Sequence, residues 1–372
     1  MRERIRRRPG SPHHQLTKNS KGVIAVHALL PDARLSRLAG ARVLVTGGAG
    51  LIGSRIMRLL TALGADAVAL DRMDAYPHPV NDLFGLDPAR VITGDVCQSD
   101  TVRPLVNDAE YVIHAAAYAD VAACTRQPAA ACAANVCGTQ TVIQEVQAAS
   151  AARRMVFISS AAVYGDPAEG QGPVEFCEDQ PPHPISVYGN AKLWGETEAR
   201  LRLTGGGVGF CVLRYFSVYG DPQVPKPGSH SWMVACLAMR AHLGLPLLLH
   251  GGGHQVRDMV HVEDIARATV LALVAEQAAG QTINVGSGIA TSVRQIAERI
   301  ATHYPRAQLI DTPRPEGDPL GGYAATARSR ELLGWRPTIA VKDGIDRYVD
   351  WLQANPRAIP EWMRSEAAVA VT

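Results

Sequence analysis

Short runs of β-branched and other apolar residues recur along the chain from residue 42 onward. We expect each run to form a buried strand, because each is four to six residues long and carries few polar positions. The runs are 42–46, 67–70, 90–93, 111–115, 154–159, 210–215 and 282–285. Longer segments with helical spacing separate most of them, among them 52–63 and 185–203. This alternation predicts an α/β fold, a Rossmann-type doubly wound parallel sheet with helices on both faces.

The pattern changes after residue 216, where loops become rich in Pro and Gly. The loops 220–228, 250–254 and 312–319 are of this kind, and helices are expected near 292–303 and 342–353. We therefore predict a smaller C-terminal substrate-binding region laid over the carboxyl edge of the sheet. The expected division is a Rossmann domain at 41–215, to which 255–290 returns, and a substrate-binding region at 216–254 and 291–360.

Composition narrows the class of protein. The chain has 372 residues, of which 47% are hydrophobic, and no apolar run approaches the roughly 20 residues that span a bilayer. We therefore expect a globular protein without membrane association. Seven cysteines form no CxxC pair, which favours reduced thiols in a cytoplasmic protein.

The basic residues gather at the start of the chain. Residues 1–40 contain nine Lys or Arg and two acidic residues, and we expect them to form a disordered extension. The remainder is weakly acidic, although the whole chain has a net charge of +2. An acidic body argues against nucleic acid as a partner.

A glycine triplet stands between the first predicted strand and the first predicted helix. Gly47, Gly50 and Gly53 are spaced three apart in TGGAGLIG (46–53), with Leu51 and Ile52 opening the helix. Glycine is needed there because a pyrophosphate must approach backbone N–H groups at a helix N-terminus without a Cβ in the way. The pattern predicts a dinucleotide site.

The second predicted strand ends in an acid, Asp71, 18 residues after Gly53. A carboxylate at this point accepts hydrogen bonds from the adenosine ribose and repels a 2′-phosphate, which favours NAD as the cofactor. The neighbouring Arg72 is a residue type that could hold a 2′-phosphate. NADP therefore stays open as the alternative.

Tyr188 and Lys192 lie four positions apart, so a helix would place both side chains on one face. A free tyrosine has a pKa of about 10, and an ammonium one turn away, with a positive nicotinamide ring, favours its phenolate. Lowering that pKa by about 3 units requires about 4 kcal/mol. Such a pair can take a proton from a hydroxyl while hydride leaves the same carbon for the nicotinamide.

Together these motifs resemble the extended short-chain dehydrogenase/reductases acting on nucleotide sugars, a family of NAD-dependent epimerases and dehydratases that includes UDP-glucose and UDP-glucuronate 4-epimerases. The resemblance covers roughly residues 42–352. Its further motifs, in order, are GDV (94–96), HAAA (114–117), NVCGT (135–139), SSAAVYG (159–165), YGNAK (188–192), LRYFSVYG (213–220), QVRDMVHVED (255–264) and PEGDP (315–319). It implies tightly held NAD(P), a nucleoside-diphosphate sugar in the cleft, and a homodimer formed through long helices near 125–149 and 186–203.

The resemblance also implies roles for single residues. Ser160, Tyr188 and Lys192 would form the catalytic set, with Ser160 bonded to the sugar hydroxyl beside Tyr188. The implied cofactor contacts, besides the glycine loop, Asp71 and Arg72, are Asp95, Val96, Ala115, Ala116, Ala117, Asn135, Tyr188, Lys192 and Tyr215. The implied substrate contacts are Ser160, Ser217, Arg257, Arg314 and Asp318. Guanidinium geometry suits Arg257 to the diphosphate.

Two alanines decide which reaction we expect. In members that look like 4,6-dehydratases an Asp-Glu pair follows the catalytic Ser or Thr, and members that look like UDP-glucuronate decarboxylases keep the Glu. Ala161 and Ala162 stand there in this chain, and a methyl group can neither donate nor accept a proton. We therefore place epimerisation at C4 through a transient 4-keto sugar first. A 4-ketoreductase or dehydrogenase comes second and a dehydratase or decarboxylase third, with a non-catalytic NAD-binding scaffold as the alternative from another class.

Two positions depart from the family pattern. Ser217 stands where many 4-epimerases carry Asn, and Asp120 follows HAAA without a lysine near it in the sequence to meet the substrate. Both leave the identity of the sugar open. His250, His254 and His261 lack the companion ligands of a metal site, so no metal is expected. HGGG (250–253) matches a lipase string, but the sequence has no G-x-S-x-G, which argues against a hydrolase.

Overall fold

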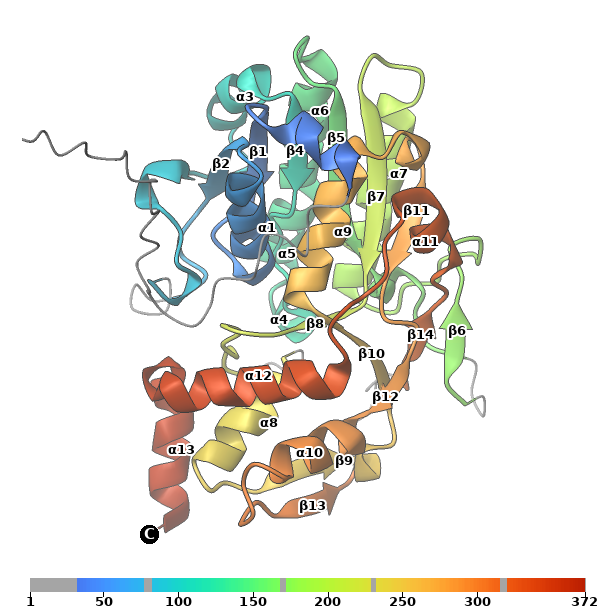
Figure 1. Ribbon diagram of the computed structural model, residues 1–372. Helices are drawn as coiled ribbons and strands as arrows, with labels where there is room; N and C mark the ends of the chain where they lie inside the picture. The colour runs from blue at the N-terminus through green and yellow to red at the C-terminus, as the bar shows by residue number, and fades with distance from the viewer. Residues whose placement is uncertain (1–31, 77–81, 168–171, 229–231, 315–319, 372) are drawn as a thin grey trace, which may run out of the picture.

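The computed structural model describes residues 32–76, 82–167, 172–228, 232–314 and 320–371. Within these ranges seven parallel strands form a central sheet in the order β11-β7-β5-β4-β1-β2-β3 (Figure 1). The strands are β1 (Arg42–Thr46), β2 (Asp66–Asp71), β3 (Val91–Thr93), β4 (Tyr111–His114), β5 (Arg154–Ser160), β7 (Gly209–Tyr215) and β11 (Thr282–Val285). The chain starts in the interior of the sheet and builds outward in both directions. The structure confirms all seven predicted strands and the Rossmann-type fold.

Helices cover both faces of this sheet. One face carries α1 (Leu51–Ala62) and α9 (Val262–Val274), and the other carries α3 (Ser99–Asp108), α6 (Gly138–Ala148) and α7 (Val187–Leu203). In β1, Val43 and Val45 join the core under α1 and α9, whereas Leu44 joins the core under α3, α6 and α7. Successive side chains of a strand point to opposite faces, so a strand covered on both sides is apolar throughout.

The expected long helix near 125–149 is interrupted. It consists of α4 (Val121–Arg126), α5 (Pro128–Cys132), a π-helical segment η5 (Ala133–Cys137) and then α6. The break lies at Gln127, whose φ of −131° and ψ of 64° are not helical. Pro128 explains it, because the proline ring disfavours the α conformation of the residue before it.

A second region lies below the sheet in Figure 1. Its core joins α8 (Met233–His242), α10 (Val293–Ala301) and α12 (Val341–Ala354), which include the two helices expected there, and α13 (Glu361–Val371) follows. A three-stranded sheet holds β12 (Ala290–Ser292), β10 (Val256–His261) and β8 (Ser217–Tyr219), and a two-stranded sheet holds β13 (Leu309–Thr312) and β9 (Leu247–His250). Because β8 begins two residues after β7 ends, the carboxyl edge of the central sheet leads directly into this region.

Segment 255–290 contributes to both parts. Its strand β10 pairs with β8 and β12, whereas α9 and β11 belong to the central sheet. The remaining elements are β6 (Val174–Phe176), β14 (Gly322–Ala324), α11 (Ala327–Leu333) and the short helices η3 (Asp82–Phe84), η4 (Pro88–Arg90), η6 (Ala161–Val163), η7 (Gly251–Gly253), η8 (Glu276–Ala278) and η9 (Pro356–Ala358).

The expected disordered extension does not reach residue 40. A 3-10 helix, η2 (Ala33–Leu38), precedes β1 and is capped by the Asp32 carboxylate, which accepts a hydrogen bond from the N–H of Arg34 at 3.0 Å. Leu35 and Leu38 are buried in the core under α9. Two leucines three positions apart share one face of such a helix, and their burial holds the segment on the domain. Residues 1–31 lie outside the described ranges.

Where the structure describes the chain, no helix combines the length and the apolar character needed to cross a membrane.

Candidate active site

The glycine loop after β1 has the geometry of a phosphate cradle. Gly47 has a φ of +69°, and a Cβ there would lie 2.7 Å from backbone atoms of Ala116. A Cβ on Gly53 would lie 2.1 Å from the carbonyl oxygen of Gly47. Gly50 caps α1, and a Cβ there would meet only the Gly47 carbonyl oxygen, at 3.5 Å. Gly47 and Gly53 thus let the loop fold tightly, while Gly50 keeps the helix N-terminus open to an anion.

Asp71 fastens the end of β2 to this loop. Its Oδ2 accepts a hydrogen bond from the N–H of Ala49 at 3.0 Å, and its Oδ1 accepts one from Met73 at 3.0 Å. Each carboxylate oxygen retains a lone pair for a ribose hydroxyl. The residues present therefore fit the adenosine half of NAD.

Arg72 is already engaged by two carboxylates. It forms an ion pair with Asp74, and its Nη1 lies 3.7 Å from Oδ2 of Asp95. Asp95 in turn accepts a hydrogen bond from the N–H of Cys97 at 2.9 Å. Because the charge of Arg72 is balanced by Asp74 and Asp95, a 2′-phosphate gains little there, and the geometry favours NAD over NADP.

At several predicted cofactor positions the side chain is either buried or no larger than a methyl group, so a cofactor would meet mainly the backbone there. Val96 is buried against Gly138, where a Cβ would lie 2.7 Å from its Cγ2. Ala115, Ala116 and Ala117 follow β4 and are partly exposed, and the backbone of Ala115 and Ala116 lies against Gly47 of the glycine loop. Small side chains there leave room for a planar ligand.

Asn135 holds the segment that follows these alanines. Its Oδ1 accepts a hydrogen bond from the N–H of Tyr118 at 2.7 Å, and its Nδ2 donates to the Tyr118 carbonyl at 3.1 Å. The side chain is 2% exposed. Both polar atoms of the amide are therefore used inside the protein, so Asn135 positions the 115–120 segment and does not itself face a cofactor.

Tyr215 does not reach the cofactor site either. Its ring is buried in the core under α9, and its hydroxyl is hydrogen-bonded to Oγ1 of Thr269 on that helix. Cys211 and Leu213, at two-residue intervals on the same strand, lie in the same core. The prediction for Tyr215 was wrong because the motif does not say which face of β7 the side chain takes.

The predicted catalytic residues come from the end of β5 and the first turns of α7. Ser160 ends β5, and its Oγ accepts a hydrogen bond from the N–H of Ala162 at 3.2 Å. Ser186 caps α7 by accepting a hydrogen bond from Gly189 at 3.0 Å, which fixes where the helix starts. Tyr188 and Lys192 follow on one face of α7, and the Lys192 ammonium lies 5.8 Å from the centre of the Tyr188 ring. The structure therefore brings the three predicted residues together.

The charges differ from the sequence-based expectation. Burial raises the pKa of Tyr188 to about 12, opposed by its hydrogen-bonding neighbour Ser160. Burial lowers the pKa of Lys192 to about 8, and its Nζ donates a hydrogen bond to the Ile158 carbonyl at 2.8 Å. In the protein alone the phenol is therefore harder to ionise than free tyrosine. Burial is the largest cause of this shift, and the expected depression, which includes the charge of the nicotinamide ring, stays a prediction for the cofactor-bound enzyme.

The two alanines after Ser160 begin the 3-10 turn η6, whose hydrogen bonds are made by the backbone, and Ala161 also packs against the core around Tyr164 and Phe176. The Ala161 carbonyl accepts a hydrogen bond from Tyr164 at 3.0 Å, and the Ala162 carbonyl lies against Gly189 of α7. Both alanines are partly exposed. The side chains offered by this turn are methyl groups without acid or base function.

A buried ion pair supports the catalytic helix and was missed in the sequence. Glu196, one turn after Lys192, accepts hydrogen bonds from Arg214 at 2.9 and 2.7 Å and from the hydroxyl of Ser159 at 2.5 Å. The side chains of Arg214 and Glu196 are 5% and 3% exposed. An acid on α7 and a basic residue inside the apolar strand β7 were the available signals, because a charge in a buried strand requires a partner.

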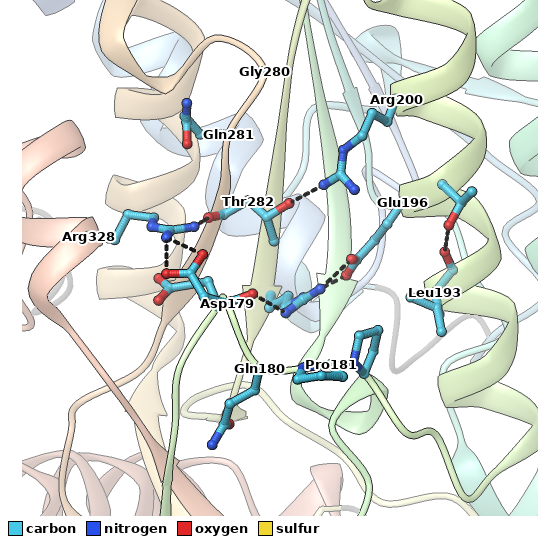
Figure 2. Close-up of a pocket in the computed structure, with 14 residues that line it drawn as sticks. Asp179, Gln180, Pro181, Leu193, Glu196, Arg200, Gly280, Gln281, Thr282 and Arg328 are labelled. Atoms are coloured by element: carbon cyan, nitrogen blue, oxygen red, sulfur yellow. Dashed lines mark hydrogen bonds and ion pairs between the residues drawn. The ribbon is translucent and has the colours of Figure 1, made fainter.

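A surface hollow opens beside this ion pair, and Figure 2 shows it. Arg328 forms an ion pair with Asp179 at 2.8 Å, and Arg200 donates a hydrogen bond to Thr282 at 3.1 Å. The residues that line the hollow do not include Ser160, Tyr188 or Lys192. It is therefore separate from the candidate active site.

Apart from Ser160, the predicted substrate residues that the structure describes lie in the second region. Ser217 is in β8 and Arg257 is in β10, the neighbouring strand, where Met259 pairs with Ser217. Arg257 donates a hydrogen bond to the Val256 carbonyl at 2.7 Å. Arg314 is exposed, and its side chain runs along Gly251, where a Cβ would lie 3.1 Å away. Asp318 lies outside the described residues.

The histidines of this region serve the fold. His250 is hydrogen-bonded through Nδ1 to Thr312 at 2.8 Å, and His261 caps α9 by accepting a hydrogen bond from Glu263 at 3.3 Å. Burial lowers the pKa of His261 to about 4, so it is neutral at physiological pH. Across the described ranges, no three His, Cys, Asp or Glu side chains gather as a metal site would require.

Comparison with known proteins places this arrangement among its relatives. A UDP-glucose 4-epimerase from Azospirillum brasilense is 34% identical over 335 residues, which cover 83% of this chain and 91% of that protein. The structure of a UDP-glucose 4-epimerase from Thermotoga maritima with UDP-glucose has a TM-score of 0.76 at 28% identity, covering 85% of this chain and 99% of that one. A UDP-glucose 4-epimerase from Thermus thermophilus in complex with NAD has a TM-score of 0.74 at 28% identity, covering 84% and 99%. Residues 43–286 match the NAD dependent epimerase/dehydratase family, and the chain belongs to that family.

Proposed function

We propose that this protein interconverts the two C4 epimers of a nucleoside-diphosphate sugar through a transient 4-keto sugar. The observation that carries the proposal is the meeting of Ser160, Tyr188 and Lys192 beside a turn that offers only the methyl groups of Ala161 and Ala162. This arrangement can remove and return the proton of one carbinol, and a bound NAD would take and return the hydride. The relatives named above, UDP-glucose 4-epimerases, support the same reading.

NAD, when bound, supplies the hydride acceptor and donor and a positive charge next to Tyr188. Gly47, Gly50 and Gly53 would hold its pyrophosphate, and Asp71 its adenosine ribose. In the protein alone the Tyr188 phenol stays protonated at neutral pH, since its pKa is about 12. We infer that it becomes the base once cofactor and substrate complete the site.

The three catalytic residues then have distinct tasks. Tyr188 takes the proton from the C4 hydroxyl and later returns it. Ser160 holds the same oxygen in place. Lys192, anchored on the Ile158 carbonyl, keeps a positive charge near the phenol, because at neutral pH the ammonium form prevails for a pKa of about 8. Each cycle returns both the hydride and the proton, so the cofactor is regenerated.

On the substrate side we propose that Arg257 binds the diphosphate and that Ser217 hydrogen-bonds a substrate oxygen. Arg314 and Asp318 would contact the far phosphate and ribose. A homodimer through α6 and α7, a cytoplasmic location and a place in carbohydrate metabolism complete the proposal. The seven cysteines, which all lie in described parts of the chain and are free, agree with a reducing compartment.

The purified enzyme tests this function directly. Incubated with UDP-glucose and no added NAD, it should form UDP-galactose, followed by NMR, without net change in the absorbance of reduced cofactor. Tyr188→Phe should lower kcat by at least 100-fold, whereas Tyr304→Phe, which alters a hydroxyl 3.3 Å from His242 in the second region, should leave it unchanged. Steady net oxidation of reduced cofactor with a 4-keto sugar nucleotide would instead establish a ketoreductase.

A further inference from the structure

One carboxylate oxygen beside the catalytic helix has no partner among the described residues. Asp120 caps α4, and its Oδ1 accepts a hydrogen bond from the N–H of Ala123 at 2.5 Å. Its Oδ2 is buried and accepts no hydrogen bond there, and the residue as a whole is 5% exposed. Such an oxygen has lost water without gaining a donor, which is unfavourable. Among the described residues no donor meets this oxygen, so it is open to a donor supplied by a ligand.

Capping the helix does not require an aspartate here. Ser186 and Ser292 cap α7 and α10 through a single hydroxyl oxygen. A serine at residue 120 would cap α4 equally well, because both residue types are good helix caps. Aspartate adds a second oxygen and a negative charge, and only these two additions need a further role.

The position of Asp120 at the start of α4 connects it with the catalytic pair Tyr188 and Lys192. Helix α4 packs against α7. Cys124, one helical turn after Asp120, is an electrostatic neighbour of Asp120, of Tyr188 and of Lys192. Asp120 and the catalytic pair thus share Cys124 as an electrostatic neighbour.

The other side of α4 faces the loop that follows β8. Arg126 donates a hydrogen bond to the Gly228 carbonyl at 3.1 Å. Lys226 of the same loop lies 4.9 Å from the centre of the Tyr76 ring, and Asp120 is among its electrostatic neighbours. Helix α4, which Asp120 caps, thus contacts both the catalytic helix and the loop leading from Ser217, and we take the space between these two as the place of the sugar.

The charge around Asp120 restricts what can bind there. The acidic electrostatic neighbours of Lys226 are Asp120, Asp74 and Asp71, three carboxylates around one ammonium. A carboxylate only accepts hydrogen bonds, so a ligand group that faces it must be a donor. A hydroxyl or an amine fits this surrounding, whereas a second carboxylate would be repelled.

We propose that Oδ2 of Asp120 accepts a hydrogen bond from a hydroxyl of the substrate's sugar, and that this contact selects a neutral hexose over a sugar acid such as glucuronate. The inference rests on the proposed function, since it assumes a nucleotide sugar in this cleft. It makes Asp120 a determinant of specificity, while proton transfer stays with Tyr188.

Two substitutions separate this role from helix capping. Asp120→Ser keeps a capping oxygen and removes Oδ2 with its charge, and Asp120→Asn keeps the shape but places an amide donor there. Asp87→Asn is the matched control, because Asp87 also caps a helix, accepting from Ala89 at 3.0 Å, and is exposed. Binding of UDP, UDP-glucose and UDP-glucuronate to the NAD-loaded enzyme is measured by calorimetry, and UDP-glucose turnover by NMR.

In both Asp120 variants the affinity for UDP-glucose should fall about 10- to 100-fold, the loss expected for a hydrogen bond to a charged group. Affinity for UDP and bound NAD content should stay unchanged, and UDP-glucuronate should bind as well or better. The control should match the wild type throughout.

The outcomes distinguish the inference from the function on which it rests. The role of Asp120 is refuted if the Asp120 variants bind UDP-glucose as tightly as the wild type does, with both affinities taken relative to UDP, and still reject UDP-glucuronate. This conclusion holds whether or not the enzyme turns over its substrate. If the wild type epimerises no nucleotide sugar while the binding contrast holds, the proposed reaction fails and the role of Asp120 stands.

Discussion

The carbonyl oxygen of Ala162 lies 2.3 Å from the position that a Cβ on Gly189 would occupy. The turn that carries Ser160 is therefore pressed directly onto the first turn of α7 at Gly189, the residue after Tyr188. A glycine at 189 permits this approach, and the approach sets the separation of Ser160 from Tyr188.

Substituting Gly189 by alanine should push the turn and the helix apart. We expect Gly189→Ala to lower kcat at least 10-fold and to destabilise the protein by about 1–3 kcal/mol, the usual cost of overpacking. Denaturant unfolding and epimerase assays measure both effects. Gly207→Ala is the control, since a Cβ there meets nothing within 4 Å; equal behaviour of the two variants would contradict the argument.

Removing Glu196 should leave Arg214 buried without its partner. Glu196→Ala is expected to reduce the free energy of unfolding by about 3–5 kcal/mol, because an uncompensated charge remains in the core. Glu198→Ala, on the same helix, removes the partly exposed pair with Arg202 and should reduce it by less than about 1 kcal/mol. Similar losses in the two variants would show that burial of the Arg214 pair is unimportant.

Lys192 should make the stability of the cofactor-free protein depend on pH. Its pKa is about 8 in the folded protein and 10.5 in the reference state, so the unfolded chain binds more protons between these values. Stability should therefore rise with pH in this window, by up to about 1.4 kcal/mol per unit, and the unfavourable contribution of Lys192 should be complete below pH 8. The comparison is with Lys192→Met, which should lack this increment; parallel curves for the two proteins would contradict the assignment.

Cofactor choice should depend on the acids around Arg72. Asp71→Ser should weaken NAD binding about 10- to 100-fold through the lost ribose contacts, without gain for NADP, because Arg72 remains paired with Asp74. Asp71→Ser/Asp74→Ser releases the guanidinium and should raise the share of NADP. Reconstitution in an equimolar mixture, followed by analysis of the bound nucleotide, measures this share; a gain from the single substitution alone would show that Asp74 does not restrain Arg72.

Much of this fold could be predicted because each strand of the central sheet is covered on both faces. A strand buried on both sides has to be apolar throughout, so β1 and β11 could be delimited to the residue from their composition. The tight loop after β1 could equally be predicted from its glycines, because close contacts within the loop itself require Gly47 and Gly53.

The sequence was less informative where a role depends on side-chain direction. The motif around Tyr215 does not reveal that the ring faces α9. The motif around Asn135 does not reveal that both polar atoms of its amide are hydrogen-bonded to the backbone of Tyr118. The Tyr188 pKa likewise depends on how much protein surrounds the phenol, a property of the assembled fold. The electrostatic interaction between Lys226 and Asp120 links residues 106 positions apart, and no local sequence pattern could have predicted it.

The turn after Ser160 has a wider consequence. Its hydrogen bonds and its contact with Gly189 use only backbone atoms and the Ser160 hydroxyl, so the hydrogen bonding of the turn does not depend on the side chains at 161 and 162. Chemistry can be exchanged at these two positions while the scaffold stays intact. Substitutions at 161 and 162 can therefore bring an acid or a base into the site without removing a hydrogen bond of the turn.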